Sequence, residues 1–452
     1  MISLDSYQKG FRNLPDGVKD AEVNAETHRV ISVQIENGEI SEVKESSSVQ
    51  IFVRVKTEHT GYAYTEDPEE DAAELLKEAY ENSLFSAEDP EPFSVSEERW
   101  LQDQEAPETM EELKQLAMRM EAAIASELGF WKARSECMLE LLAETYGQHT
   151  VNIRGMDRGF TAPVYLLSVT LAGENMTVRE ERMSSDPEKF DLSGLAESLI
   201  RRLQAGMIPA VLPEAGEYHA ILSSEAAGQM FMTAWQAFSG EKLACGESCL
   251  SRLLGQMISS EALTIIDVSD RKDGFPAFMD SEGTKGKTIA VVKNGIFVQP
   301  ICNLKSAELL HTQPTGNAGR RPLLSGMIST DLKEIPKNFC ILPGLSSLQE
   351  MEAHMGNGFL ITEYFDLFHS LNIASGDFSV PVYAVRIKDG KECGMVRGLT
   401  MSGNFPAMLK EIREVGCEAV LRPMEFLRNY GIGTCPIRIG KVTLSGESQT
   451  GL

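Results

Sequence analysis

The sequence predicts an α+β protein of two domains. An N-terminal domain of mixed strands and helices spans residues 1–212, and a C-terminal domain dominated by antiparallel sheet spans residues 213–452. Three observations predict this class. At 452 residues the chain is longer than one hydrophobic core usually serves. Helical and strand-like periods alternate in the first half, whereas short strand-like runs with glycine turns fill the second. Two prolines and a glycine in IPAVLPEAGE (208–217) indicate the boundary.

The first half carries signals for both kinds of element. Residues 29–64 alternate apolar and polar side chains around Asn37-Gly38, a tight-turn signal, which predicts a β-hairpin or meander. Apolar residues recur at helical intervals in 69–82 and 108–127, which predicts two amphipathic helices. Strand-like alternation resumes over 149–183, and a further helix is expected at 191–206.

The second half changes character after one or two helices expected at 223–259. Short apolar runs separated by glycine-bearing turns predict an antiparallel sandwich or a barrel-like sheet. A helix at 404–415 interrupts this series. The expected strands lie at 262–268, 287–301, 357–365, 379–403 and 436–446.

Composition indicates which partners and which cellular location to expect. The chain has 67 acidic and 42 basic residues, a formal net charge of -25. Because nucleic-acid binding depends on Lys and Arg that displace counterions from phosphates, direct nucleic-acid binding is not expected. Eight cysteines are scattered along the chain without the dense spacing of a disulfide scaffold, which favours reduced thiols in the cytoplasm. The sequence shows neither a signal-peptide pattern nor 18 consecutive apolar residues, so we expect a cytoplasmic protein without a membrane span.

The segment ILSSEAAGQMF (221–231) resembles a zinc-peptidase helix that lacks its ligands. A zinc peptidase presents two histidines from one helix, a glutamate that activates the metal-bound water, and a third ligand from elsewhere. The segment is similar to the signature helix of the TldD/PmbA family, also called modulators of DNA gyrase, whose active subunit carries His-Glu-x-x-x-His. On that pattern Ser224 takes the first histidine position, Glu225 keeps the glutamate, and Gln229 takes the second histidine position.

The resemblance extends over nearly the whole chain and is clearest over residues 217–447. Five blocks that are similar to those of the family occur in the family's order. The blocks are residues 239–267, 278–297, 315–321, 358–380 and 398–404.

The resemblance implies a function in peptide hydrolysis. The family forms an intracellular peptidase of two related subunits, TldD with zinc and TldE (PmbA) without it, that acts on unfolded or extended peptides. Its third zinc ligand is a cysteine near the C-terminus, and Cys435 lies in that region, although burial as a small apolar side chain is favoured for it. Ser and Gln are poor zinc ligands. The chain is therefore expected to be a TldE-like, non-catalytic subunit without its own metal, with zinc in a TldD-like partner.

Two other sequence features are candidate binding or interface sites. Glycines and polar donors in TGNAGRR (315–321) suit either a structural turn or a carboxylate clamp, and we favour the anchoring of a strand or subunit edge. His369 is a lone histidine, a residue that more often has a structural role. The candidate residues are Thr315, Gly316, Asn317, Arg320, Arg321 and His369.

Two alternatives stay open. The chain is a peptidase in its own right if Cys435 and histidines such as His311 or His369 hold a metal. It is a homodimeric peptide-binding protein if no catalytic partner exists. A short helix that begins at Ser223 or Ser224 and packs closely through Ala226 and Ala227 also makes structural sense without any ancestral chemistry.

Overall fold

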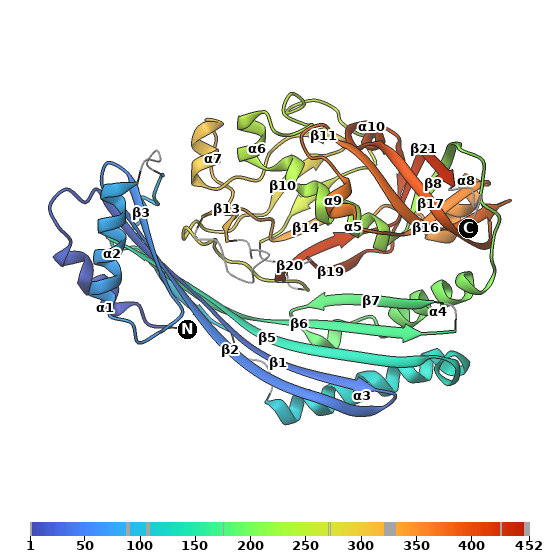
Figure 1. Ribbon diagram of the computed structural model, residues 1–452, viewed down its shortest axis with the longest axis horizontal. Coiled ribbons are helices and arrows are strands. Elements are labelled where there is room, and N and C mark those ends of the chain that lie inside the picture. The colour runs from blue at the N-terminus through green and yellow to red at the C-terminus, as the bar shows by residue number, and fades with distance from the viewer. Residues whose placement is uncertain are drawn as a thin grey trace, which may run out of the picture.

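The computed structural model describes residues 2–86, 91–104, 109–174, 176–269, 271, 273–320, 331–424 and 427–446. The first half forms a long curved sheet, and the second half forms a thicker body over the concave side of that sheet (Figure 1). No helix in these ranges is long and apolar enough to cross a membrane.

The N-terminal layer is a seven-stranded sheet of order β3-β2-β1-β5-β6-β4, in which β4 and β7 pair with different stretches of β6. All its pairs are antiparallel except β4–β6. Its elements are α1 (Asp5–Gly10), η1 (Phe11–Asn13), β1 (Asp20–Glu36), β2 (Glu39–Lys56), β3 (Thr60–Thr65), α2 (Ala72–Phe85), β4 (Arg99–Asp103), α3 (Met110–Leu128), η2 (Gly129–Arg134), β5 (Glu136–Asn152), β6 (Asp157–Ala172), β7 (Thr177–Ser184), η3 (Pro187–Lys189) and α4 (Leu192–Met207).

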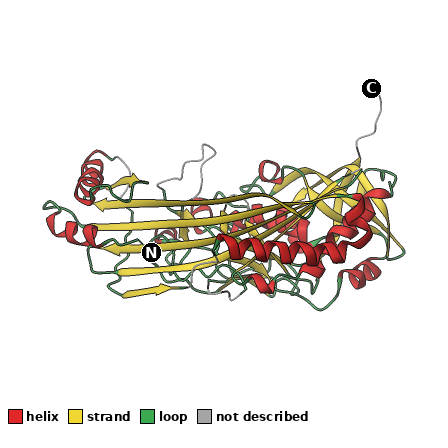
Figure 2. Ribbon diagram, turned by 90° about the horizontal axis from the view of Figure 1, so that it is seen from below, coloured by secondary structure: helices red, strands yellow, loops and turns green. Residues whose placement is uncertain are grey.

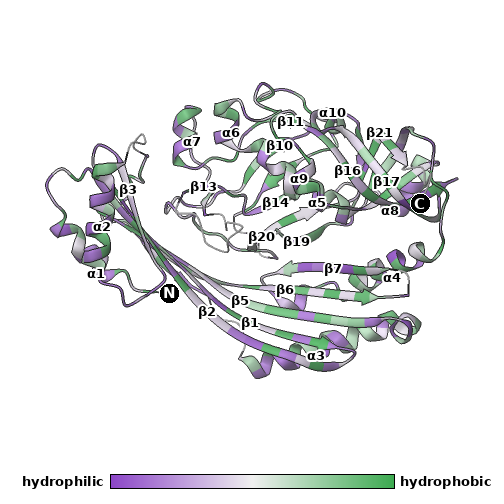
Figure 3. Cartoon of the chain, in the orientation of Figure 1, coloured by the Kyte–Doolittle hydropathy of each residue, from purple (hydrophilic) through white to green (hydrophobic). Residues whose placement is uncertain are grey.

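Local sequence explains this layer. Asn37 and Gly38 have φ of 50° and 90°, which a two-residue turn between twisted strands requires, so the predicted hairpin is confirmed. Hydrophobic and hydrophilic residues alternate along β1 and β2 (Figure 3). A capping box at Thr109 begins α3. The apolar faces of α3 and α4 bury one face of the sheet, and Figure 2 shows helices in front of the strands on this side.

The C-terminal body contains a closed barrel and a second sheet. In the barrel β8, β15, β16, β17 and β21 form a ring that closes through β17–β21, and the second sheet has the order β11-β10-β9-β14-β20-β19. The elements are β8 (Gly216–Leu222), α5 (Ser224–Ala234), η4 (Trp235–Phe238), α6 (Gly240–Cys245), β9 (Ile265–Asp267), β10 (Ile289–Lys293), β11 (Ile296–Phe297), α7 (Leu304–Leu309), β12 (Ala318–Gly319), β13 (Lys333–Glu334), β14 (Asn338–Ile341), α8 (Leu348–Met355), β15 (Gly358–Tyr364), α9 (Leu367–Ser370), β16 (Asp377–Lys388), β17 (Lys391–Asn404), α10 (Phe405–Lys410), β18 (Ile412–Val415), β19 (Val420–Met424), β20 (Leu427–Thr434) and β21 (Ile437–Gly446).

The predicted α+β class with a barrel-like, sheet-rich second half is confirmed. The two layers share a core, because Tyr146 of β5 packs edge-on against Phe275 with ring centroids 5.2 Å apart. β7 belongs to the first sheet and β8 to the barrel. The domain boundary at 212/213 stays a prediction.

Three predictions of element boundaries were wrong. The helix expected at 404–415 ends at Lys410, and residues 412–415 pair with β21 as β18, because cross-strand pairing outweighs the helical spacing. The helices expected through residue 259 end at Cys245, where Gly246 takes a left-handed conformation. The strand expected from 149 begins at Glu136 as β5.

Candidate functional site

Helix α5 carries the motif residues at the junction between the two layers. Ser223 ends the loop after β8, and its Oγ accepts a hydrogen bond from the N–H of Ala226 at 3.1 Å, which starts the helix. Ala226, Ala227 and Gly228 are buried against the shared core. Ser224 and Glu225 are therefore held at a fixed helix N-terminus, and the predicted capping role of Ser223 is confirmed.

Arg422 of β19 lies against the first turn of α5. Its side chain is buried, with the residue 3% exposed. Its Nη1 donates to the Ser224 carbonyl at 3.2 Å and its Nη2 to Ser224 Oγ at 3.2 Å. Its Nε lies 2.6 Å from Glu225 Oε2. One guanidinium group thus contacts two of the three motif positions.

Glu180 of β7 connects this site to the first sheet. The residue is 1% exposed, and its carboxylate lies 2.6 Å from Arg182, 3.4 Å from Arg202 and 3.6 Å from Arg422. Ser198 Oγ donates to it at 2.7 Å. Burial alone raises the pKa of Glu180, but the three arginines outweigh it and hold the pKa at about 2. The carboxylate is therefore ionised at neutral pH.

Gln229 is held by the barrel. Its Oε1 accepts a hydrogen bond from the backbone N–H of Tyr364 at 2.8 Å, at the end of β15. This hydrogen bond connects α5 to the barrel. It also uses one of the two lone pairs of the amide oxygen, so fewer remain to bind a ligand.

Two cavities meet at the motif. One, of about 510 Å³, is lined by Ser223, Ser224 and Glu225 together with residues of β7 and α4. The other, of about 870 Å³, is lined by Glu225, Gln229 and His369. Both cavities share Glu225 and Arg202. The structure therefore brings His369 and the motif helix into one cavity.

His369 is exposed at the rim of the larger cavity. Its Nδ1 lies 2.5 Å from Asp366 Oδ1, on the turn that begins α9. This pairing orients the imidazole without linking it to the motif residues.

Cys435 is separate from this cluster. The residue is fully buried, and its thiol lies 3.8 Å from the carbonyl of Ile341. Its neighbour Thr434 donates to the Ser224 carbonyl at 2.7 Å. Cys435 follows the last residue of β20, and its thiol contacts the end of β14 instead of a motif residue. Burial raises the pKa of its thiol to about 12, so it stays protonated.

The residues present do not fit a zinc ion. Ser224 Oγ accepts from Arg422, the Gln229 oxygen accepts from Tyr364, and the buried Cys435 thiol contacts the Ile341 carbonyl. A buried guanidinium beside Glu225 adds a positive charge where a divalent cation would have to bind. Within the described ranges no three His, Cys, Asp or Glu side chains gather as a metal site.

The 315–321 loop lies at a different junction, between the C-terminal body and the first sheet. Thr315 Oγ1 donates to the Cys302 carbonyl at 2.9 Å, and Asn317 Nδ2 donates to Asp267 Oδ2 at 2.7 Å. Gly316 has φ of 80°, and a Cβ there would lie 2.8 Å from the Lys285 carbonyl oxygen. These contacts are those of a structural turn.

Arg320 carries the loop's contact with the first sheet. Its Nη1 donates to Asn24 Oδ1 at 2.7 Å, and its guanidinium lies 3.8 Å from the centre of the Phe52 ring. This contact joins the loop to the first sheet, and an anchoring role for the loop stays a prediction. Arg321 lies outside the described residues.

Sequence reasoning missed the charged residues around α5. Glu180, Arg182, Arg202 and Arg422 are distant in sequence from the motif and carry no recognised spacing. A signal existed in VLRPM (420–424), where one arginine interrupts an apolar strand, because a buried charge in a strand needs a partner.

Comparison with known proteins identifies the family. The PmbA/TldA metallopeptidase C-terminal domain matches residues 215–446, just over half of the chain, and PmbA/TldA metallopeptidase domain 1 matches residues 21–83. The chain belongs to the PmbA/TldD metallopeptidase family. The predicted membership of the TldD/PmbA family is thereby confirmed.

Family relatives match along the whole chain. A protein of Methanothermobacter thermautotrophicus named metalloprotease is 24% identical over 96% of this chain and 94% of its own length. A Thermotoga maritima structure described as a modulator of a DNA gyrase superposes with a TM-score of 0.78, at 18% identity, over 98% of this chain and 100% of the other. The structure of TldE from Thermococcus kodakarensis superposes with a TM-score of 0.76, at 21% identity, over 97% and 98%. The two structures show that the PmbA/TldD fold is shared.

Proposed function

We propose that this PmbA/TldD family member is a non-catalytic, TldE-like cytoplasmic subunit that assembles with a zinc-bearing TldD-like subunit and binds unfolded peptides. One observation carries the proposal. At each position where the family resemblance expects a zinc ligand, the side chain already contacts another group of the protein. Ser224 is bound by Arg422, Gln229 by Tyr364, and Cys435 is turned into the core. The similar fold of a TldE structure supports the subunit type.

We place the peptide in the two cavities that meet at Glu225. Together they flank α5 and the β7 side of the first sheet, and an extended segment that enters either cavity reaches this residue. Acidic side chains outnumber basic ones in both linings, including Glu181, Glu363 and Asp366 in the larger cavity. Binding of an unfolded segment here relies on main-chain hydrogen bonds and favours positively charged peptides.

Purified chain tests the proposal directly. We expect substoichiometric zinc by elemental analysis, no cleavage of an unfolded polypeptide by the chain alone, and cleavage once a zinc-loaded TldD-like subunit is added and co-elutes with it. Stoichiometric zinc with cleavage by the single chain would make it a peptidase in its own right. A homodimer that binds peptide but never co-elutes with a TldD-like subunit would favour the self-sufficient peptide-binding protein.

The larger cavity offers an exposed aromatic anchor for a peptide. Phe368 is 54% exposed and lines this cavity beside His369. Phe368→Ala is expected to weaken binding of a labelled unfolded peptide about fivefold, which corresponds to ~1 kcal/mol, measured by fluorescence anisotropy.

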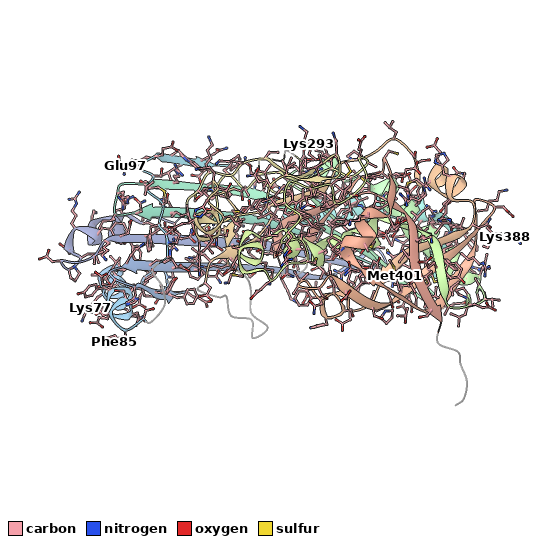
Figure 4. The ribbon with its side chains drawn as sticks, turned by 90° about the horizontal axis from the view of Figure 1, so that it is seen from above. Lys77, Phe85, Glu97, Lys293, Lys388 and Met401 are labelled. Atoms are coloured by element: carbon pink, nitrogen blue, oxygen red, sulfur yellow. The ribbon has the colours of Figure 1, made fainter. Side chains whose placement is uncertain are left out.

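Phe85 supplies the matched control. It is 86% exposed at the end of α2, at the far end of the molecule in Figure 4. Phe85→Ala removes the same ring and is expected to leave the affinity unchanged. Equal affinities of the two variants would place the peptide elsewhere.

A further inference from the structure

The side chain of Arg422 lies beside Gly228 of the motif helix. Gly228 lies one turn after Ser224 and Glu225, and a Cβ on it would lie 3.8 Å from Arg422 Nη1 and 3.9 Å from its Cδ. The guanidinium therefore rests on the side of α5 that carries the first two motif positions. Three elements, α5, β7 and β19, enclose it.

The charges around Arg422 are those that a metal cation would otherwise balance. Its Nε lies 2.6 Å from Glu225 Oε2, and its Nη2 lies 3.6 Å from Glu180 Oε2. Nη2 also donates to the Ser224 hydroxyl oxygen, and the remaining nitrogen, Nη1, donates to the Ser224 carbonyl oxygen. The group thus takes oxygen partners from three directions, as a bound cation does.

We infer that the guanidinium group of Arg422 is a built-in cation that takes the place of the divalent metal at this helix and excludes one. A second positive charge brought beside a buried guanidinium is repelled strongly, because little solvent screens the pair. The site then differs from a zinc-binding helix in two ways: it lacks the two histidines, and it contains the positive charge of Arg422. The inference goes beyond the proposed function, since it depends on neither a partner nor a peptide.

The fold is expected to tolerate loss of this cation. Glu180 keeps Arg182, Arg202 and Ser198 as partners when Arg422 is replaced. The side chain of Glu225 is 22% exposed and can be solvated. Neither carboxylate is left buried without a partner.

Zinc affinity in three matched variants tests the inference. Ser224→His and Gln229→His together supply two imidazoles, and this pair is combined with the native Arg422, with Arg422→Lys, or with Arg422→Gln. Zinc affinity is measured by competition with a chromogenic chelator, and folding by circular dichroism and thermal melting. The native arginine and the lysine variant are expected to stay equally poor in zinc, whereas the glutamine variant gains about ten- to a hundredfold in affinity.

The lysine variant separates charge from geometry, because it keeps the charge but loses the planar fork. Equal zinc affinity in all three backgrounds, whether tight or weak, would overturn the inference. An equal gain in the lysine and glutamine variants would also overturn it, because charge would then not be the cause.

Single variants give the same comparison if the histidine pair disturbs folding. Arg422→Gln alone is expected to bind Mn²⁺, which suits carboxylate oxygens, more tightly than Arg422→Lys alone, because only the glutamine variant leaves Glu225 without a cationic partner. Equal Mn²⁺ binding by the two would contradict the inference. None of these measurements involves a TldD-like subunit or peptide cleavage, so failure here is distinct from failure of the proposed function.

Discussion

Arg54→Met is expected to lower the free energy of unfolding by about 3–5 kcal/mol, as removal of one partner from a buried ion pair does. Arg54 of β2 is 1% exposed, and its guanidinium donates to Glu22 at 2.9 Å and to Glu91 at 3.2 Å. Burial lowers the pKa of Arg54, but Glu22, Glu282 and Glu91 outweigh it and raise the pKa above its usual value. Methionine fills most of the space but leaves Glu22 and Glu282 buried without their main cation.

Arg29→Ala is the control for this loss, measured by urea unfolding followed by fluorescence. Arg29 lies on the neighbouring strand β1 and pairs with Glu45 at 2.9 Å, but both side chains are 41% exposed. An exposed pair contributes at most about 1 kcal/mol, so a small change is expected. Similar losses of unfolding free energy in the two variants would show that burial does not determine how much the Arg54 ion pairs stabilise the protein.

The fold was predictable where local sequence decides it. The Asn37-Gly38 turn and the Thr109 capping box determine the first hairpin and α3 through contacts within a few residues. The strand at 412–415 was not predictable in this way. Its spacing of Ile412 and Val415 also suits a helix, and only pairing with β21 selects the extended form.

The same limit applies to the site. Sequence placed Ser224, Glu225 and Gln229 on one helix, and the structure has that helix. The partner that determines the chemistry, Arg422, is 198 residues away from Ser224, and Glu180 lies in the other layer of the molecule. No local pattern links them, because the pairing of β6 with β7 and of β19 with β20 brings them together. A charged residue inside an apolar strand indicates that a partner exists but not where it lies.

Glu180→Gln tests how much that partnership stabilises the protein. At neutral pH the variant is expected to lose about 3 kcal/mol of unfolding free energy, because a pKa of about 2 in place of 4.5 corresponds to that difference between the charged and neutral forms. Glutamine keeps the shape and the acceptor oxygen for Ser198. It removes the charge that holds Arg182, Arg202 and Arg422 together.

The pH dependence identifies the charge as the cause. The folded-state pKa of Glu180 is lower than the unfolded value, so the stabilisation is complete above about pH 4.5 and is lost as the pH falls towards about 2. The difference in stability between native protein and Glu180→Gln should therefore shrink through that window, as measured by urea unfolding at each pH. Glu58→Gln serves as the control, because Lys19 lowers the pKa of Glu58 too, but solvent screens this exposed pair, so the curve should change far less. If the difference in stability stays the same down to about pH 2, the glutamine must disturb packing. Packing, more than the charge of Glu180, would then hold the arginines of β7, α4 and β19 in place.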